Sequence, residues 1–434
     1  MRHPRRRLRW SMTVVVAVLA ALASACSSAP AGPPVLTWYI NPDDGGQAEI
    51  AQRCTAASGG RYTIAVSQLP REASEQRQQL VRRLAANDSS IDIMSMDPPY
   101  IPEFAEAGFL APMPDALISQ VSQGVVPSAL AGASWRGRLV TVPFWANTQL
   151  LWYRKSMVAQ MGLDMSRPVT WDQIIGAAQR AGTRVAAQGT RAEALIVWIN
   201  ALIESGGGSV ITGTDPADPR MVTLGLTDPP GIEAARIMRS LSDAGVAGPG
   251  FSTQDEDASA TLFEDGDAAF MTVWPFIWPR ATGKVEEGAM TPQVLADYGW
   301  TTYPQVTPDR PSAPPYGGIN LGVGAFSAHP DLAYDATRCI TSPANQAYYF
   351  VSNGNPASNV AAYADPGVLA EFPMAPVILQ SLTQAAPRPQ TPYYAEVSES
   401  LQRTFHPTDA IVPGATNAAA QQLIQAVLAK EALL

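Results

Sequence analysis

Polar side chains follow two predicted strands in the first quarter of the chain, at the points where the strands end. Asn41 and Asp43 come directly after the apolar segment 34–40, and Asp97 comes directly after the apolar segment 91–96. The carboxyl ends of parallel strands meet at one edge of a sheet, and ligands of α/β proteins bind beyond that edge. These three side chains are therefore candidates for binding a polar ligand.

Clustered carboxylates are also what a glycosidase needs, since it places an acid and a base or nucleophile on either side of the bond it cleaves. The clusters in this chain are Asp43–Asp44, Asp255–Glu256–Asp257 and Glu264–Asp265–Asp267. Solvated loops and the first turns of helices carry the same residues for purely structural reasons. A secreted glycosidase stays open as an alternative to a protein that only binds.

Other common chemistries have little support in the sequence. His3 lies in the leader, and His329 and His406 each precede a proline in loop-like sequence, so a Ser-His-Asp triad or a histidine metal site is disfavoured. The glycine run at 206–208 lacks the following lysine that a phosphate-binding loop requires. The sequence predicts no cofactor and no metal.

Residues 1–26 form an export signal, with five arginines, an apolar run and small residues before Cys26. The ending is similar to the lipobox of bacterial lipoproteins, and the polar, proline-rich residues 27–34 are similar to their tether, so we expect acyl chains on Cys26. Ordinary signal cleavage is the alternative. Without the five arginines, 24 basic residues face 38 acidic ones, a net charge of −14. This predicts no affinity for nucleic acid, and the lipid, not charge, would hold the protein at the membrane.

The length of 434 residues and the apolar content of 46% predict a folded protein of two lobes. The N-terminal part alternates strands and helices, which favours a parallel sheet with helical crossovers. Its expected elements are strands at 34–40, 61–68 and 91–96 and helices at 47–58 and 72–86. Extended, aromatic-rich sequence at 138–155 then indicates a crossing into a second lobe, where Thr170 opens a helix as a capping box with Gln173. The expected elements beyond it are helices at 190–204, 231–243 and 255–264 and strands at 267–273, 299–304 and 317–326.

Together, the lipobox, the α/β pattern and the segment "FEDGDAAFMTVWPFIWPR" at 263–280 resemble the carbohydrate-binding lipoproteins of bacterial ABC importers, of the maltose-binding-protein type. The resemblance covers almost the whole mature chain. It implies a periplasmic-binding-protein-like fold of two α/β lobes, each a mostly parallel sheet flanked by helices, joined by hinge crossovers. The implied boundaries are 35–145 plus 320–362 for lobe one and 146–319 plus 363–434 for lobe two.

More narrowly, the chain is similar to the trehalose-binding lipoproteins of mycobacteria. This resemblance implies a monomeric, extracytoplasmic, non-enzymatic receptor that passes trehalose to the permease and ATPase subunits of an ABC importer. Another sugar or a glycerophosphodiester remains the alternative ligand. The implied ligand-binding positions are Asn41, Asp43, Gln47, Asp97, Asn147, Glu256, Trp274, Gly318 and Arg403.

The aromatic segment 274–280 fits this ligand class. A pyranose has an apolar C–H face that stacks on an indole, and its hydroxyls need hydrogen-bond partners once water is excluded. We expect Trp274 to be the stacking platform, held in a loop stiffened by prolines. Core packing is the expected role of Phe276 or Trp278.

Cys54 and Cys339 remain after export, in a compartment where disulfides persist, and either pair or stay as two buried thiols. The resemblance implies that they pair, because in that family the helix after the return strand packs back onto the first lobe.

Overall fold

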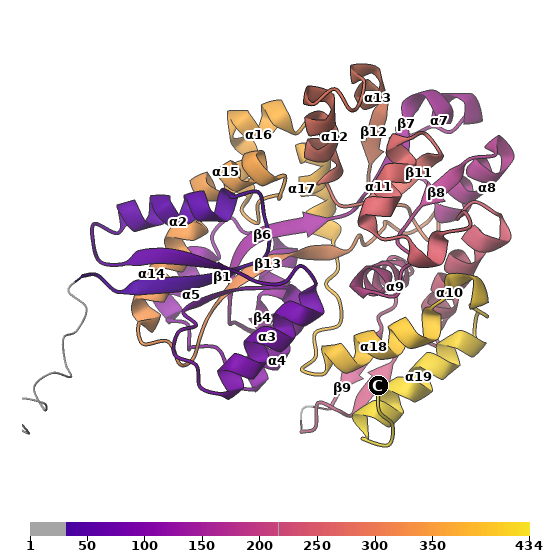
Figure 1. Cartoon of the computed structure of the whole chain (residues 1–434). Helices are drawn as coiled ribbons and strands as arrows, with labels where there is room; N and C mark the ends of the chain where they lie inside the picture. The colour runs from indigo at the N-terminus through magenta and orange to yellow at the C-terminus, as the bar shows by residue number, and fades with distance from the viewer. Residues whose placement is uncertain (1–31, 216) are drawn as a thin grey trace, which may run out of the picture.

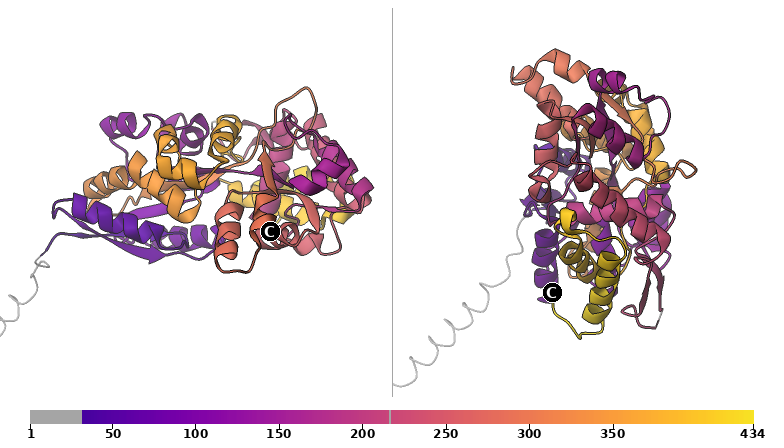
Figure 2. Two further views of the ribbon diagram at one scale, coloured as in Figure 1. Left: turned by 90° about the horizontal axis from the view of Figure 1, so that it is seen from above. Right: turned by 90° about the vertical axis from the view of Figure 1, so that its right-hand side faces the viewer.

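The computed structural model describes residues 32–215 and 217–434, so the leader and Cys26 lie outside the described residues. The described chain forms two lobes, each built on a β-sheet with helices around it (Figure 1). Seen from above, the lobes lie side by side along the long axis of the molecule (Figure 2, left). The two-lobed α/β fold predicted from the sequence is confirmed.

The first sheet has the strand order β2-β1-β3-β13-β6. Its strands are β1 (Val35–Ile40), β2 (Thr63–Gln68), β3 (Ile93–Met96), β6 (Val142–Thr148) and β13 (Tyr316–Val323). As predicted, β1 runs parallel to β2 and to β3, whereas β13 is antiparallel to β3 and to β6. The sheet is therefore mixed rather than mostly parallel, because β6 and β13 pass directly between the lobes without a helical crossover.

Both faces of the first sheet are covered. One face carries α2 (Gly46–Ala57), α14 (Pro330–Ile340) and α15 (Pro343–Asn353), and the other carries α3 (Ala73–Ala85) and α4 (Ile101–Glu106). Successive side chains of a strand point to opposite faces of the sheet. Trp38 and Ile40 of β1 therefore pack on the face covered by α2, α14 and α15, and Tyr39 packs on the face covered by α3 and α4. Burial on both faces explains why the bulky side chains of Trp38, Tyr39 and Ile40 follow one another in this strand without an intervening small polar residue.

The second sheet, with the strand order β12-β7-β11-β8, is mixed as well. Its strands are β7 (Leu150–Arg154), β8 (Arg184–Ala186), β11 (Ala268–Val273) and β12 (Tyr298–Thr301). β7 is antiparallel to β11 and to β12, and β11 is parallel to β8. The helices of this lobe include α7 (Lys155–Met161), α8 (Trp171–Ala181), α9 (Glu193–Ser205), α10 (Pro229–Asp243), α11 (Glu256–Glu264), α12 (Ile277–Glu286) and α13 (Pro292–Ala296).

The capping box predicted at the start of α8 is present. The Thr170 hydroxyl accepts a hydrogen bond from the Gln173 backbone N–H at 3.2 Å, and the Gln173 side chain accepts one from the Thr170 N–H at 2.9 Å. Two N–H groups that the helix itself leaves unpaired are thus satisfied, which fixes where α8 begins.

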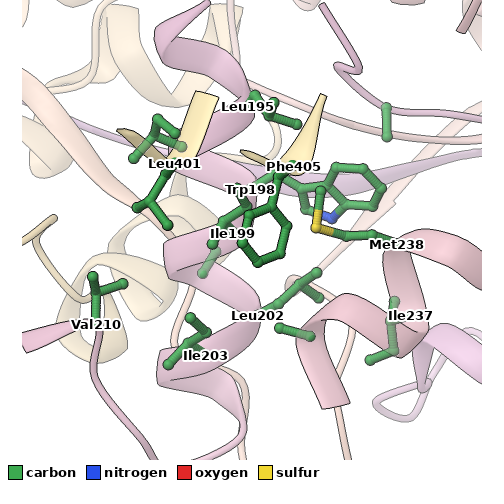
Figure 3. Close-up of a cluster of buried hydrophobic side chains, with 14 of the residues drawn as sticks. Leu195, Trp198, Ile199, Leu202, Ile203, Val210, Ile237, Met238, Leu401 and Phe405 are labelled. Carbon is green, nitrogen blue, oxygen red and sulfur yellow. The ribbon is translucent and has the colours of Figure 1, made fainter. Parts of the chain in front are cut away.

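Helix α9 lies at the centre of the second lobe. Its buried side chains face α10 and α18 (Tyr394–Phe405) in the cluster that Figure 3 labels as Leu195, Trp198, Ile199, Leu202, Ile203, Val210, Ile237, Met238, Leu401 and Phe405. A helix that is apolar on all sides is stable only when it is fully enclosed. The enclosure holds the N-terminal end of α9 in a fixed position, and the first residue there is Glu193.

The chain crosses between the lobes at Gln149, between β12 and β13 at 302–315, and again at 385–393. The last crossing is inferred from the packing of the helices on either side of it. α17 (Ala375–Gln384) contacts α6 (Pro127–Gly132) and β6, whereas α18 packs with α9, and α19 (Ala415–Leu428) packs with α10 and α18. The residue boundaries of the lobes stay a prediction.

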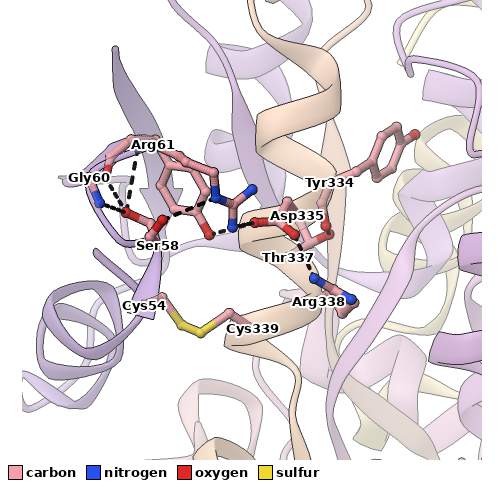
Figure 4. A network of polar contacts seen from close by, with 10 residues as sticks. Cys54, Ser58, Gly60, Arg61, Tyr334, Asp335, Thr337, Arg338 and Cys339 are labelled. Atoms are coloured by element: carbon pink, nitrogen blue, oxygen red, sulfur yellow. Dashed lines mark hydrogen bonds and ion pairs between the residues drawn. A yellow bond between two sulfur atoms is a disulfide. The ribbon is translucent and has the colours of Figure 1, made fainter. Parts of the chain in front are cut away.

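Cys54 of α2 and Cys339 of α14 form a disulfide, with their Cα atoms 5.8 Å apart, which confirms the implied pairing. Beside it, the Arg61 guanidinium contacts Asp335 of α14 at 2.6 Å, and Asp335 also pairs with Arg338 (Figure 4). These contacts attach the C-terminal part of lobe one to its first helix.

The other described elements are short: η1 (Pro98–Tyr100), α5 (Asp115–Val121), β4 (Ser134–Trp135), β5 (Arg138–Leu139), β9 (Ile211–Thr214), β10 (Val222–Leu224), η2 (Phe251–Thr253), η3 (Val360–Ala364), α16 (Pro366–Glu371) and η4 (Thr408–Ala410). Within the described ranges, no helix combines the length and the apolar character needed to cross a membrane.

Candidate functional site

Asp43 caps helix α2 in the loop after β1. Its Oδ2 accepts a hydrogen bond from the Gln47 backbone N–H at 2.7 Å, and its Oδ1 accepts one from the Gly45 N–H at 3.1 Å. A carboxylate is favourable at a helix N-terminus because unpaired N–H groups and the positive end of the helix dipole meet there. The structure therefore gives Asp43 a local structural role beside any contact with a ligand.

Gln47 of α2 is hydrogen-bonded to Asn41, the residue that follows β1. The buried Gln47 donates from Nε2 to the Asn41 carbonyl at 3.0 Å, and its Oε1 lies 3.5 Å from the Ser95 hydroxyl, which accepts from Trp38 Nε1. Gln47 is thereby committed to holding β1 and β3 together. The Asn41 side-chain oxygen is buried and has no hydrogen-bond partner among the described residues.

Asp97, at the end of β3, contacts the second lobe through an arginine. Arg388 Nη2 lies 2.6 Å from Asp97 Oδ1, and Arg388 Nη1 lies 2.5 Å from Glu193 Oε1. Only 5% of the Arg388 side chain is exposed, against 15% of Asp97 and 17% of Glu193. We call these three residues the inter-lobe ion cluster, since Asp97 follows β3 of the first sheet, Glu193 begins α9 and Arg388 lies in the crossing 385–393.

The inter-lobe ion cluster holds two carboxylates and one guanidinium. Burial raises the pKa of Asp97 to about 6, and Glu193 adds to this increase, while Arg388 opposes it. Burial by itself lowers the pKa of Arg388, but Asp97, Tyr394 and Glu193 outweigh that effect and raise it above its usual value. The guanidinium is therefore always charged, and Asp97 is the group whose charge can change near neutral pH.

Trp274 follows directly after β11 and reaches the crossing strands. The benzo edge of its half-buried indole packs on Gly317 of β13, where an added Cβ would lie 2.9 Å from the ring. Gly317 pairs in turn with Asn147 of β6, so the structure brings Trp274 and Asn147 together. Gly318 has a φ of +116°, and an added Cβ would lie 2.2 Å from the Trp145 carbonyl oxygen. Gly318 is therefore required by the backbone and contributes no side chain.

Trp278 and Phe276 pack against the core of the second lobe and its surroundings. Trp278 donates from Nε1 to the Glu371 carbonyl at 2.7 Å and meets the Trp300 ring edge-on at a centroid distance of 5.5 Å. These contacts are those of a packing residue.

Glu256 is the first residue of α11 and is half-buried. Burial raises its pKa, and the neighbouring Asp255, Glu72 and Asp257 add to the increase. Since Glu72 precedes α3 in the first lobe, α11 begins close to that lobe. An exposed contact of 3.6 Å between Arg71 and Asp257 joins the lobes at the same place.

Arg403 is not brought to this region by any described contact. Its side chain is 39% exposed on α18 and pairs with Glu399, one turn earlier on the same helix. The arginine that reaches Asp97 is Arg388. Neither Arg388 nor Glu193 was predicted as a site residue from the sequence. The run "PRPQTP" at 387–392 was the available signal, because prolines on both sides hold an arginine in extended backbone.

Several polar atoms in this region are buried without a hydrogen-bond partner among the described residues: Asn41 Oδ1, Arg388 Nε and Gln390 Oε1. Buried polar groups are costly unless they are hydrogen-bonded, so such atoms suit a polar ligand or ordered water. A groove of about 430 Å³ adjoins the cluster, lined from the first lobe by Arg77 and Tyr100 and from the second by Glu193 and Gln402, among others.

The arrangement can bind a hydroxyl-rich solute. Carboxylates accept hydrogen bonds from hydroxyls, a guanidinium donates to them, and an indole covers an apolar face. In the described part of the chain, no group of three or more His, Cys, Asp or Glu side chains is arranged to hold a metal ion.

Comparison with known proteins agrees with the fold. Residues 62–347 match the family model of the bacterial extracellular solute-binding proteins. A probable ABC transporter-binding protein of Deinococcus radiodurans is 24% identical over 362 residues, which cover 79% of this chain and 81% of the relative.

Solved structures of similar shape include maltose-bound MalE3 of T. maritima, which has a TM-score of 0.74 and 24% identity and covers 91% of this chain and 99% of that one. UgpB of Mycobacterium tuberculosis in complex with glycerophosphocholine has a TM-score of 0.73 and 21% identity, with coverage of 92% and 99%. At these identities the likeness establishes the fold.

Proposed function

The chain belongs to the bacterial extracellular solute-binding protein family, and from that premise we propose that it is the receptor of an ABC sugar importer. It captures a hydroxyl-rich solute, with trehalose as the first candidate, between its two lobes. It then delivers the solute to the permease and ATPase subunits. The protein acts by binding and release and carries out no reaction.

The observation that carries this proposal is the inter-lobe ion cluster. A ligand can shift a hinge only by binding one arrangement of the lobes better than the other, so it must contact both. Asp97 and Arg388 supply polar groups from the two sides of the cleft, 2.6 Å apart. Asn41 Oδ1 and Arg388 Nε, which are buried and have no hydrogen-bond partner within the described part of the chain, lie on these same two sides and add an acceptor and a donor.

The choice of trehalose as the first candidate ligand rests on the sequence resemblance, and the residue types of the site support it. Trp274 supplies a flat apolar surface next to Asn147, and the carboxylates suit neutral hydroxyls better than phosphates. The similar structures carry different ligands, since MalE3 is maltose-bound and UgpB is in complex with glycerophosphocholine. The alternative ligands are therefore another sugar and a glycerophosphodiester.

We propose that the mature protein is tethered to the outer face of the cell membrane by acyl chains on Cys26. We also propose lobe one at 35–145 plus 320–362 and lobe two at 146–319 plus 363–434, a division that counts α17 with lobe two although α17 contacts α6 and β6. As ligand-contacting residues we propose Asn41, Asp43, Gln47, Asp97, Asn147, Glu256, Trp274 and the Gly318 backbone, with Arg388 in the role first expected of Arg403.

Calorimetric titration of the protein with trehalose, maltose and glycerophosphocholine tests the function. We expect trehalose to bind tightest and to raise the melting temperature by mass action. Trp274→Ala should weaken binding at little cost in stability, and Trp278→Ala, its matched control, should lose stability and retain affinity. Tighter binding of maltose or glycerophosphocholine would show that trehalose is not the preferred ligand. Release of glucose on prolonged incubation with trehalose would show that the protein is a glycosidase and not a receptor.

A further inference from the structure

The carboxylate of Glu193 is held by groups of its own lobe. Oε1 accepts hydrogen bonds from Arg388 Nη1 and from the Tyr394 hydroxyl, and Oε2 accepts one from the Ser398 hydroxyl at 2.8 Å. Tyr394 and Ser398 lie one turn apart on α18 and are both buried. Three segments of the second lobe, namely α9, α18 and the crossing 385–393, therefore meet at one side chain.

These bonds leave Glu193 little capacity to contact a ligand, but they determine where the arginine lies. With Nη1 bound to Glu193, the Arg388 guanidinium directs Nη2 to Asp97 at 2.6 Å, and its Nε stays without a partner among the described residues. Arginine carries several rotatable bonds, so without a second anchor a contact across a cleft would cost much side-chain entropy. Because Glu193 already fixes the guanidinium within the second lobe, most of this side-chain entropy is lost before the lobes meet, and the contact with Asp97 costs correspondingly less.

The position of Glu193 on α9 strengthens the anchor. It occupies the first residue of the helix, where the unpaired N–H groups stabilise a negative charge. The helix itself is enclosed by the core of the second lobe, so the carboxylate cannot follow Asp97 when the cleft opens.

We propose that Glu193 is a positioning residue that holds Arg388 as the second lobe's half of the contact with Asp97, and that it thereby sets how strongly the lobes close. The expected effect of Glu193 on ligand affinity rests on the proposed function. Its expected effect on the distance between the unliganded lobes does not depend on that function.

The test uses Glu193→Gln, Arg388→Ala and the double variant, with Glu233→Gln as the matched control. Glu233 also pairs with an arginine, Arg236 at 2.6 Å, but on the surface of the same lobe, where 32% of its side chain is exposed. Two readouts are measured: trehalose affinity by calorimetry, and the inter-lobe distance in unliganded protein by pulsed EPR between spin labels at R82C on α3 and Q422C on α19, both exposed positions.

We expect Glu193→Gln to lengthen the inter-lobe distance and to lower affinity about tenfold or more, as expected when one partner of a buried charge pair is removed. In the Arg388→Ala background the same change should have no further effect on either readout, because Glu193 acts through Arg388. A general loss of structure would instead add to the effect of Arg388→Ala.

The proposal is overturned if Glu193→Gln leaves both readouts as in Glu233→Gln, or if its effects add to those of Arg388→Ala. If Glu193→Gln does not fold, Ser398→Ala replaces it, because that change removes one donor to Glu193 and leaves the charge in place. If the parent protein binds none of the sugars, the proposed function fails, and the distance measurement still decides the role of Glu193.

Discussion

A single guanidinium lies between two carboxylates where the two lobes meet. Arg388 satisfies Asp97 and Glu193 at once, and the group as a whole keeps one excess negative charge. Such a buried group is expensive to assemble, and its members depend on each other more than exposed pairs do. Changes to any of its three residues should therefore affect binding and closure together.

The charge of Asp97 should make ligand binding depend on pH. The charged groups and phenols that act on it are Arg388, Glu193, Tyr100 and Tyr316. Because its pKa is raised to about 6, lowering the pH through that value protonates Asp97 and weakens its contact with Arg388. We expect calorimetric affinity to fall between about pH 7 and about pH 5, and the fall to be absent in Asp97→Asn.

The same shift has a defined sign for stability. A carboxyl whose folded pKa lies above its unfolded value of 3.8 costs stability above about pH 6, and the cost is relieved as the pH falls between these values. The melting temperature of Asp97→Asn relative to the parent should therefore be highest above pH 6. An equal difference at about pH 4 and about pH 7 would contradict the shift.

Two arginines of the C-terminal region should differ sharply on substitution. Arg388→Ala removes the contact across the cleft and leaves two carboxylates buried together, so affinity should fall about 30-fold or more. Arg403→Ala removes an exposed pair with Glu399, a contact of the kind that contributes about 0–1 kcal/mol, and a long hydrogen bond to the Leu433 carbonyl, so affinity should be unchanged. Calorimetry on both variants decides which arginine serves the site, and the opposite pattern would restore Arg403.

Among the elements, α2 and α14 are joined most directly. The disulfide between them closes a loop over a sequence separation of 285 residues, which restricts the unfolded chain strongly. Replacing both Cys54 and Cys339 by serine should lower the free energy of unfolding by about 2–5 kcal/mol, as measured by denaturant titration. Ligand affinity should change little, because the bond lies two turns beyond Gln47 along α2. A large loss of affinity at unchanged stability would show that the bridge shapes the site.

At the scale of the whole molecule, the crossings decide how the lobes can move. β6 and β13 are bound to each other along the first sheet, so the crossing strands resist separation of the lobes while leaving room for rotation. The exposed Arg71 and Asp257 contact adds little to closure, since surface pairs are screened by water and salt. The buried inter-lobe ion cluster and the edge-on contact between Tyr100 and Tyr394, with ring centroids 5.3 Å apart, join the lobes where water does not screen them.

The leader predicts how the molecule is held at the cell surface. Intact-mass analysis of membrane-extracted protein should find acyl chains on Cys26, and Cys26→Ala should release the protein in soluble form, because two or three buried chains anchor far more strongly than one. An unmodified mature N-terminus would contradict the lipid anchor.

The sequence by itself determined the features that depend only on residues close together in the chain, namely the secondary-structure elements and their ends. The alternation of strands and helices, the capping box at Thr170, the helix that begins at Glu256 and the placement of Asp97 at a strand end all follow from periodicity and local hydrogen bonding. Trp274 was singled out differently, from the aromatic segment 274–280 and its resemblance to the sugar-binding family, and its contact with a ligand stays a prediction. These signals span fewer than about twenty residues each, and the fold preserves them.

Only the tertiary structure decided which distant segments meet. Arg388 and Asp97 are 291 residues apart, and Arg388 lies in a proline-rich crossing without periodicity, so nothing local distinguishes it from Arg403 on its regular helix. Glu193 looks like any acidic residue in a first helical turn until α18 packs beside it. The mixed sheets have the same origin, because the direction of β6 and β13 is set by their passage between lobes. A ligand site between two bodies is determined by how those bodies pack, and that packing is a property of the whole chain.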